Sequence, residues 1–246
     1  MTVLANLSDM HCGKGWMYRP DLAQRGLELL ARTDYDACII TGDITDWGLR
    51  FEFEMAVQLL EQIEGEIFAV PGNHDARHEG YKIFQELVGP RRNSKPLDDL
   101  LLIGLDSTSP DLDTGKIGRE QRAWMGEQIR SSSRMPVVFL HHHVIPVPDT
   151  GRERNMLVDA PGFTGDLHLL DVPLVINGHK HVPWVWRLND MVLATTGTLS
   201  CERTNYGQSF GIYRIEDGTI SVERHHIPSG RVEELYRGVF GKPSGN

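Results

Sequence analysis

The sequence has few cysteines and no long apolar run. Its three cysteines (Cys12, Cys38 and Cys201) form no Cys-x-x-Cys pair, which indicates reduced thiols rather than a disulfide framework. The longest apolar runs, such as residues 135–140, are far shorter than the roughly 18 residues of a membrane span. The first residues lack the basic and apolar regions of an export signal. We therefore expect a cytoplasmic protein with no membrane partner.

Basic clusters are also lacking. The 246 residues include 25 Lys and Arg against 34 Asp and Glu, a formal charge of −9, and Arg91 and Arg92 form only a pair. Affinity for a nucleic-acid backbone comes from clustered Lys and Arg, so the composition argues against a nucleic-acid polymer as partner. Disorder is excluded as well, because it requires low hydrophobicity with high net charge and 40% of the residues are hydrophobic.

The first half alternates short apolar runs with longer amphipathic segments. The predicted strands are residues 2–7, 36–41 and 66–70, and the predicted helices are residues 21–32, 50–63 and 79–88. Alternation at this spacing predicts βαβ units and a largely parallel sheet.

The second half is richer in strands. It has one predicted helix, residues 119–131, and strands at residues 100–105, 137–140, 172–176, 184–188, 191–195, 210–215 and 219–225. We expect these strands to form a second sheet packed on the first, with helices outside. Residues 146–165 are predicted to be a long loop and residues 228–246 an irregular tail. No repeat or linker divides the chain, so residues 1–246 are predicted to be a single domain.

Histidine is the most informative residue type. There are 11, and most occur in short clusters after apolar runs. Five clusters share this placement: Asp9-Met10-His11, Gly42-Asp43-Ile44-Thr45-Asp46, Gly72-Asn73-His74-Asp75, His141-His142-His143 and Gly178-His179-Lys180-His181. Because ligands of an α/β sheet bind beyond the carboxyl ends of its strands, these clusters are expected to converge on one edge.

Carboxylate and imidazole side chains suit divalent Mn, Fe or Zn. The candidate ligands are Asp9, His11, Asp43, Asn73, His179, His181 and one of the three consecutive histidines. They are too many for one tetrahedral ion and about right for two ions that share a carboxylate. Two such ions about 3.5–4 Å apart can activate water and hold both oxygens of a phosphoryl displacement.

Each cluster taken alone also has a structural explanation. Asp46 could cap the helix that follows it, and Asn73 with His74 after a glycine suits a turn. Cys12 adjoins a cluster and either lies near the metals or, as the simpler interpretation, fills space. Arg77 either binds a phosphate or substrate carboxylate or is an exposed arginine at a helix start. The occurrence of all five clusters in one order, each after a strand, favours a shared site.

This series resembles the calcineurin-like metallophosphoesterases, whose pattern is D-x-H, G-D-x-x-D, G-N-H-(D/E), H and G-H-x-H. The match extends from Asp9 to His181. The resemblance implies a four-layer α/β/β/α sandwich of two mixed sheets flanked by helices, with a dinuclear centre at the rim between the sheets. Its implied ligands are Asp9, His11 and His181 for the first ion, Asp43 as the bridge, and Asn73, His141 and His179 for the second ion.

The resemblance also implies two residues with catalytic roles. His74 is expected to face the substrate phosphate, where it stabilises charge or protonates the leaving oxygen. Asp46 is expected to orient His74 through a carboxylate–imidazole pair. His141 is preferred as the ligand because it directly follows an apolar run, and His143 is the alternative.

The segment HHHVIP, residues 141–146, is similar to a segment of the bacterial class III cyclic nucleotide phosphodiesterases, with Val144 where proline is common. This resemblance implies hydrolysis of small phosphodiesters, with 3′,5′-cyclic nucleotides as the leading substrates, by attack of a metal-bridging hydroxide. A phosphomonoesterase, a nuclease and a non-catalytic metal-binding scaffold are the alternatives. A homodimer, with residues 146–165 as a contact or a lid, is left open.

Overall fold

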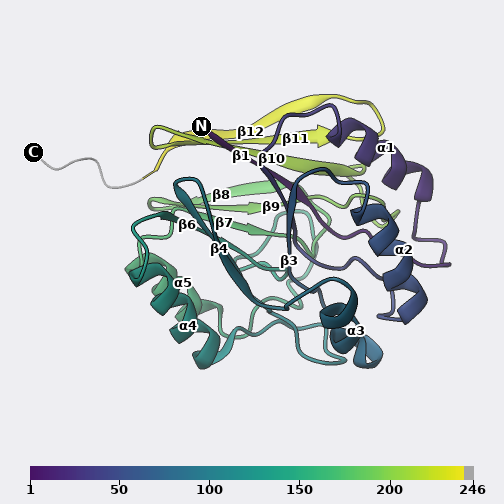
Figure 1. Cartoon of the computed structure of the whole chain (residues 1–246), viewed down its shortest axis with the longest axis horizontal. Coiled ribbons are helices and arrows are strands. Elements are labelled where there is room, and N and C mark those ends of the chain that lie inside the picture. The colour runs from purple at the N-terminus through teal and green to yellow at the C-terminus, as the bar shows by residue number, and fades with distance from the viewer. Residues whose placement is uncertain (241–246) are drawn as a thin grey trace, which may run out of the picture.

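Two six-stranded mixed sheets lie face to face, with helices on their outer faces (Figure 1). The structure is a computed structural model that describes residues 1–240. The first sheet has the order β12-β11-β10-β1-β2-β3 and the second β4-β5-β6-β7-β9-β8. This arrangement confirms the predicted four-layer α/β/β/α sandwich.

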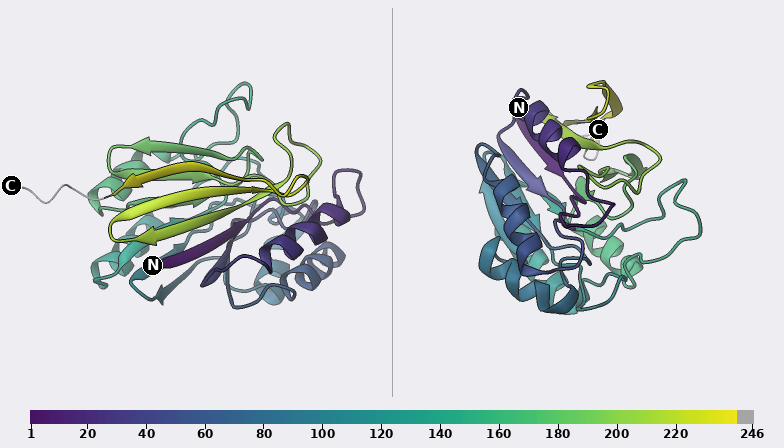
Figure 2. Two further views of the ribbon diagram at one scale, coloured as in Figure 1. Left: turned by 90° about the horizontal axis from the view of Figure 1, so that it is seen from above. Right: turned by 90° about the vertical axis from the view of Figure 1, so that its right-hand side faces the viewer.

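The first sheet combines strands from the N-terminal and the C-terminal parts of the sequence (Figure 2). It contains β1 (Thr2–Leu7), β2 (Ala37–Ile40), β3 (Glu66–Ala69), β10 (Ser209–Glu216), β11 (Thr219–His226) and β12 (Val232–Val239). The strands β1, β2 and β3 are parallel, whereas β10, β11 and β12 add antiparallel strands beyond β1. The sheet is therefore mixed, and only its N-terminal half is parallel.

The second sheet is formed by the middle of the chain. It contains β4 (Asn93–Leu97), β5 (Leu100–Gly104), β6 (Met135–Phe139), β7 (Leu174–Asn177), β8 (Trp184–Leu188) and β9 (Met191–Thr195). The strands β5, β6, β7 and β9 are parallel, and β4 and β8 are antiparallel edges.

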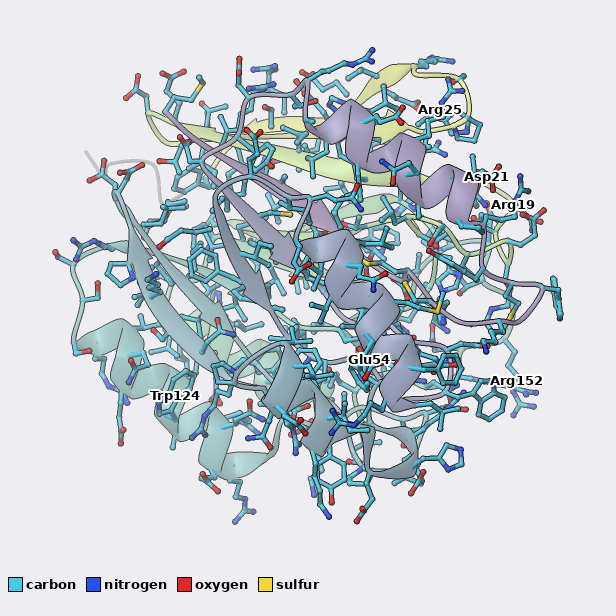
Figure 3. The ribbon with its side chains drawn as sticks, turned by 45° about the vertical axis from the view of Figure 1, so that its right-hand side comes forward. Arg19, Asp21, Arg25, Glu54, Trp124 and Arg152 are labelled. Atoms are coloured by element: carbon cyan, nitrogen blue, oxygen red, sulfur yellow. The ribbon has the colours of Figure 1, made fainter. Side chains whose placement is uncertain are left out.

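Five α-helices cover the two sheets. The first sheet is covered by α1 (Pro20–Leu30), α2 (Arg50–Leu60) and α3 (Gly80–Leu87), with a 3-10 turn at Arg77–Glu79. The second is covered by α4 (Gly118–Arg130) and α5 (Ala160–Leu169). Figure 3 shows Glu54 on α2 and Trp124 on α4, at opposite sides of the double sheet. In the described residues no helix is both long and apolar enough to cross a membrane.

Three apolar layers hold these elements together. Leu4, Ile39 and Val137 belong to the layer between the sheets. The outer layers join the first sheet to α1, α2 and α3, and the second sheet to α4 and α5. Neighbouring residues of β1 point to opposite faces, so Leu4 packs between the sheets while Ala5 packs under the helices. Both faces of these strands are buried, which explains their continuous apolar sequence.

The expected division of strands between the sheets was wrong for two of them. The strands β10 and β11 were expected in the second sheet, but β10 pairs with β1, where Leu4 lies opposite Tyr213, and β11 pairs with β10. An apolar run shows that a strand is buried, but it does not specify which sheet edge the strand joins.

The predicted secondary structure was wrong for three segments. The expected irregular tail contains β12, a mostly exposed edge strand that forms by pairing with β11. Residues 241–246 of that tail lie outside the described residues. The expected loop at residues 146–165 ends where α5 begins. Pro161 lies in the first turn of this helix, where a backbone N–H is not needed for helical hydrogen bonding, so the N–H that proline lacks is not missed. The strand β4 was missed, since it is polar and contains Pro96, which edge strands tolerate.

Candidate metal centre

The five polar clusters follow the carboxyl ends of strands from both sheets. Asp9 and His11 follow β1, Asp43 follows β2, and Asn73 follows β3, all in the first sheet. From the second sheet, His141 follows β6, and His179 and His181 follow β7. The loops meet at the rim between the sheets, so the structure brings together all seven predicted ligands.

The backbone at this rim is unusual. Five of the seven residues have φ values in the left-handed region: Asp9 (54°), His11 (49°), Asp43 (51°), His179 (77°) and His181 (55°). Residues other than glycine adopt this conformation at a cost, and it clusters at functional sites.

Two glycines let these turns approach one another. A Cβ on Gly72 would collide with the backbone and carboxylate of Asp43, and a Cβ on Gly178 would collide with Ser8 and Asp9. These positions therefore require glycine because the loops are in close contact, which accounts for the glycine that begins two of the sequence clusters.

The first group of ligand atoms gathers around His11 and His181. Their Nε2 atoms lie 3.1 Å apart, and His181 Nε2 lies 3.2 Å from Asp9 Oδ1. His11 Nε2 also lies 3.7 Å from Asp43 Oδ2. These atoms are close enough to share one ion.

The second group gathers around Asn73. Its Oδ1 lies 3.1 Å from His141 Nε2 and 3.0 Å from His179 Nδ1, and these two nitrogens are 3.1 Å apart. His141 Nε2 lies 3.4 Å from Asp43 Oδ2. The same carboxylate oxygen of Asp43 therefore faces both groups.

The outer nitrogens of two imidazoles fix the direction of their lone pairs. His141 Nδ1 donates to the carbonyl oxygen of Thr41 at 2.7 Å, and His181 Nδ1 donates to that of Arg203 at 2.9 Å. Since a carbonyl oxygen only accepts, each Nδ1 carries a proton, so each ring in its neutral form directs its Nε2 lone pair toward the centre. This is the arrangement of metal-ligating histidines.

Two buried atoms beside the centre lack partners in the described chain. His11 Nδ1 and Asp46 Oδ1 make no hydrogen bond, although they lie 3.9 Å apart. A buried polar group without a partner is costly, so its presence marks a site with a further role. Together with the converging nitrogens and carboxylates, these atoms form a donor set that fits divalent metal ions.

The charged groups of the centre shift one another's pKa values. Burial alone would raise the pKa of Asp43, but the adjacent His141, His74 and His11 hold it well below its usual value. Burial alone would lower the pKa of His141 and His181, but Asp43 raises that of His141 to about 9 and Asp9 raises that of His181 to about 10. Without cations, protons on these two rings offset the buried carboxylates.

His74 lies at the centre next to His11 and Asp43, and the ligand-type atoms of these three side chains are within 4.8 Å of one another. Its backbone N–H donates to Asp43 Oδ1 at 2.8 Å, and its Nδ1 lies 2.6 Å from the carbonyl oxygen of Asp46. Its Nε2 is 4.0 Å from Asp43 Oδ2. Burial opposes a charge on the ring, but Asp43 and Asp46 raise the pKa of His74 above its usual value.

Asp46 contacts His74 through the predicted carboxylate and also through its carbonyl oxygen. The carbonyl oxygen of Asp46 is the nearer partner of His74, and the Asp46 carboxylate is 3.6 Å from the same nitrogen. Asp46 does not cap α2 either, because the N-cap is Leu49, whose N–H donates to the Glu52 side chain at 3.2 Å.

The other two consecutive histidines point elsewhere. His143 Nε2 lies 2.8 Å from Glu153 Oε1, and burial lowers the pKa of His143 to about 4. His142 is held between Ser107 Oγ at 2.8 Å and the carbonyl oxygen of Asp113 at 3.1 Å. Of the three rings, only His141 is within 3.5 Å of both Asp43 and Asn73.

Several residues at the site were not singled out from the sequence. Asp75 accepts four hydrogen bonds, from Ile44 N, Gly72 N and both Thr45 N and Oγ1, and so ties two loops together. Cys201 lies close to His11 and His181, while Cys12 fills the core under the helices. No local pattern marks Cys201. Asp113, by contrast, lies in the run DLDTG, whose turn residues follow a predicted strand.

The fold and the centre define a metal-dependent hydrolase of phosphoric esters. Residues 2–183 match the model of one family, the calcineurin-like phosphoesterases, and the chain belongs to that family.

Named relatives and a solved structure agree with this assignment. A probable cyclic nucleotide phosphodiesterase of Synechococcus is 23% identical over 193 residues, which cover 74% of each chain. The 3′,5′-cyclic adenosine monophosphate phosphodiesterase CpdA of Haemophilus influenzae is 24% identical over 213 residues, 81% of this chain and 74% of the relative. A dimetal phosphatase from Danio rerio superposes with a TM-score of 0.74 at 12% identity, over 98% of this chain and 99% of its own, and this likeness concerns the fold alone.

Proposed function

We propose that the protein is a phosphodiesterase that hydrolyses small phosphodiesters, with 3′,5′-cyclic nucleotides as the leading substrates, at a centre of two divalent ions (Mn, Fe or Zn). The observation that carries this proposal is the position of Asp43, whose Oδ2 lies 3.7 Å from His11 Nε2 and 3.4 Å from His141 Nε2. One carboxylate oxygen between two imidazole groups is suited to a bridging ligand. The names of the Synechococcus and Haemophilus relatives support the substrate class.

Each ion would then have its own ligands. Asp9, His11 and His181 would hold the first, Asn73, His141 and His179 would hold the second, and Asp43 would serve both. The choice of His141 rests on its distance to Asp43 and Asn73, whereas the His143 ring is occupied by Glu153.

Two bound ions supply an activated water at neutral pH and offset the negative charge of the phosphoryl oxygens. The chain provides the geometry. The hydrogen bonds from His141 to the Thr41 carbonyl oxygen and from His181 to that of Arg203 fix the orientation of these two rings.

His74 provides the proton for the leaving oxygen. Its Nδ1 donates to the carbonyl oxygen of Asp46, and this bond orients the ring so that a protonated Nε2 is directed toward the centre, 4.0 Å from Asp43. Because Asp43 and Asp46 favour the charged ring, His74 can hold the proton that the departing alcohol needs.

A polar cavity beside the centre can receive the substrate. Its volume is about 450 Å³, and its lining includes His179, His181, Arg203 and Tyr206. This size suits a small ligand. Among residues 1–240, the exposed guanidinium of Arg203 has no hydrogen-bond or ion-pair partner and is available to an anionic group.

The loop between β6 and α5 lies at the mouth of this cavity. Asp149, Thr150 and Asn155 contribute to the lining, and Arg152 of the same loop extends at the edge of the molecule (Figure 3). The Tyr206 hydroxyl donates to Asp149 Oδ2 at 2.6 Å and so closes one side of the cavity. The formal charge of −9 favours a small diester over a nucleic-acid polymer.

A substrate panel tests the proposal. The protein, loaded with Mn²⁺, is assayed with 3′,5′-cyclic AMP, 5′-AMP, bis(p-nitrophenyl) phosphate and single-stranded DNA. Hydrolysis of the cyclic nucleotide and the aryl diester, with little action on the monoester and DNA, is the expected result. A protein that binds two ions and hydrolyses only the monoester or only DNA would contradict the proposal.

A further inference from the structure

Asp113 touches two residues at the edge of the metal centre. It lies in the loop of residues 105–117 that joins β5 to α4, outside the five clusters. Its Oδ1 accepts a hydrogen bond from Asn73 Nδ2 at 3.1 Å and another from the Arg77 guanidinium at 2.8 Å. One carboxylate oxygen thus contacts both the proposed metal ligand Asn73 and the guanidinium of Arg77.

The bond from Asn73 determines which way its amide points. With Nδ2 held by Asp113, Oδ1 faces inward, 3.1 Å from His141 Nε2 and 3.0 Å from His179 Nδ1. A flipped amide would turn its NH₂ group toward the cation position and its oxygen toward the Asp113 carboxylate, and both contacts are unfavourable. Asp113 therefore stabilises the orientation in which Asn73 offers a lone pair.

The bond from Arg77 places a positive charge next to His74. The Arg77 Nη1 atom lies 3.0 Å from His74 Nδ1 and 3.4 Å from the carbonyl oxygen of Asp46, and the guanidinium stacks on the Trp47 ring at 5.0 Å. The Arg77 side chain is only 18% exposed. It is therefore a fixed part of the site and is not the exposed arginine at a helix start that the sequence also allowed.

The backbone of Asp113 is held from the other side. His142 Nε2 donates to the carbonyl oxygen of Asp113 at 3.1 Å, and Ser107 Oγ donates to His142 Nδ1 at 2.8 Å. Gly115 packs directly against the His142 ring, where a Cβ would collide. These contacts give a function to the second of the three consecutive histidines, which is to anchor the loop that presents Asp113.

We propose that Asp113 is a positioning residue that fixes the Asn73 amide for the second ion and holds Arg77 beside His74. This inference rests on the proposed function, because it takes Asn73 to be a metal ligand. It goes beyond that function by assigning a role to a residue and a loop that the family pattern does not contain.

Equilibrium titration with Mn²⁺ tests the inference, with free Mn²⁺ followed by its EPR signal in the full-length protein. Asp113→Ala is expected to weaken binding of the second ion about 10- to 100-fold while leaving the first ion unchanged. Asp113→Asn retains an acceptor oxygen, so an intermediate affinity is expected. The matched control is Asp111→Ala in the same loop. Among residues 1–240, Asp111 Oδ1 accepts a hydrogen bond only from the backbone N–H of His78, at 3.0 Å. The Mn²⁺ affinities of this control should equal those of the wild type.

The outcomes separate this inference from the proposed function. If the wild type binds two ions and Asp113→Ala binds both with unchanged affinity, the positioning role of Asp113 is wrong and the proposed function stands. An equal loss in Asp111→Ala and Asp113→Ala also overturns the inference, because it shows a general effect of loop disruption. If the wild type binds fewer than two ions, the proposed function itself fails. Should Asp113→Ala not fold, as judged by circular dichroism, the Asp113→Asn titration decides.

Discussion

Asp43 Oδ2 and His141 Nε2 lie 3.4 Å apart, although the two residues follow strands of different sheets. Asp43 follows β2 in the first sheet and His141 follows β6 in the second. The contact therefore exists only when the sheets are packed on each other, and the residues between the sheets, such as Ile39 and Val137, maintain it. Formation of the centre is coupled in this way to formation of the core.

The first prediction concerns the shared carboxylate. Asp43→Asn preserves the shape of the side chain but removes the negative charge between the two imidazole groups. We expect binding of at least one ion to weaken and hydrolysis of bis(p-nitrophenyl) phosphate to fall by about 100-fold or more, as for other losses around a metal site. Metal content and steady-state rates measure the two effects. Two tightly bound ions with a rate near that of the wild type would refute a bridging role.

The second prediction concerns the proton donor. His74→Ala removes a ring that is not among the proposed ligands, so both ions should remain bound. For a cyclic nucleotide, whose leaving alcohol needs a proton, kcat should fall about 10²- to 10⁴-fold. For bis(p-nitrophenyl) phosphate, whose leaving group departs without one, the fall should be much smaller. Equal losses for both substrates would show that His74 acts in another way.

The third prediction separates the histidines at the end of β6. His141→Ala should lose the second ion and most activity, because its ring faces Asp43 and Asn73. His143→Ala is the matched control two residues away, and its loss of the contact with Glu153 should leave both ions bound. Metal analysis of the two purified variants provides the comparison. The reverse pattern would make His143 the ligand.

The fourth prediction concerns a buried thiol far from the centre. Burial raises the pKa of Cys38 to about 12. Since the thiolate is the reactive form, Cys38 in the folded protein should resist iodoacetamide at pH 8.5, and its reactivity should rise only as the pH approaches 12. Unfolding in guanidinium restores a pKa near 8.5 and should permit rapid modification, read by peptide mass spectrometry.

A surface variant controls the thiol experiment. Ser133 is exposed beyond the end of α4, so Ser133→Cys should react with iodoacetamide in the folded protein at pH 8.5. Rapid modification of Cys38 in protein that retains its native circular dichroism would contradict the prediction.

Most of the centre could be predicted from the sequence because each cluster directly follows a strand. Asp9, His11 and Asp43 follow apolar runs that are buried on both faces, and such runs are recognisable without a structure. Asp113 lies in the run DLDTG, which indicates a turn after a strand but not a functional site. Its partners Asn73 and Arg77 are about 40 residues away, and nothing in the local sequence indicates that its loop returns to the end of β3.

The alternation of strands and helices, the chemistry of the candidate ligands and their order along the chain could all be predicted from the sequence, because they depend on local apolar patterns and residue types. Three features emerged only from the folded chain: β10, β11 and β12 complete the first sheet, His141 rather than His143 faces Asp43, and the Asp46 carbonyl is the nearer partner of His74. Strand pairing and ring orientation depend on contacts between distant residues. Their energies arise from packing and hydrogen bonding across the whole fold, which no short segment encodes.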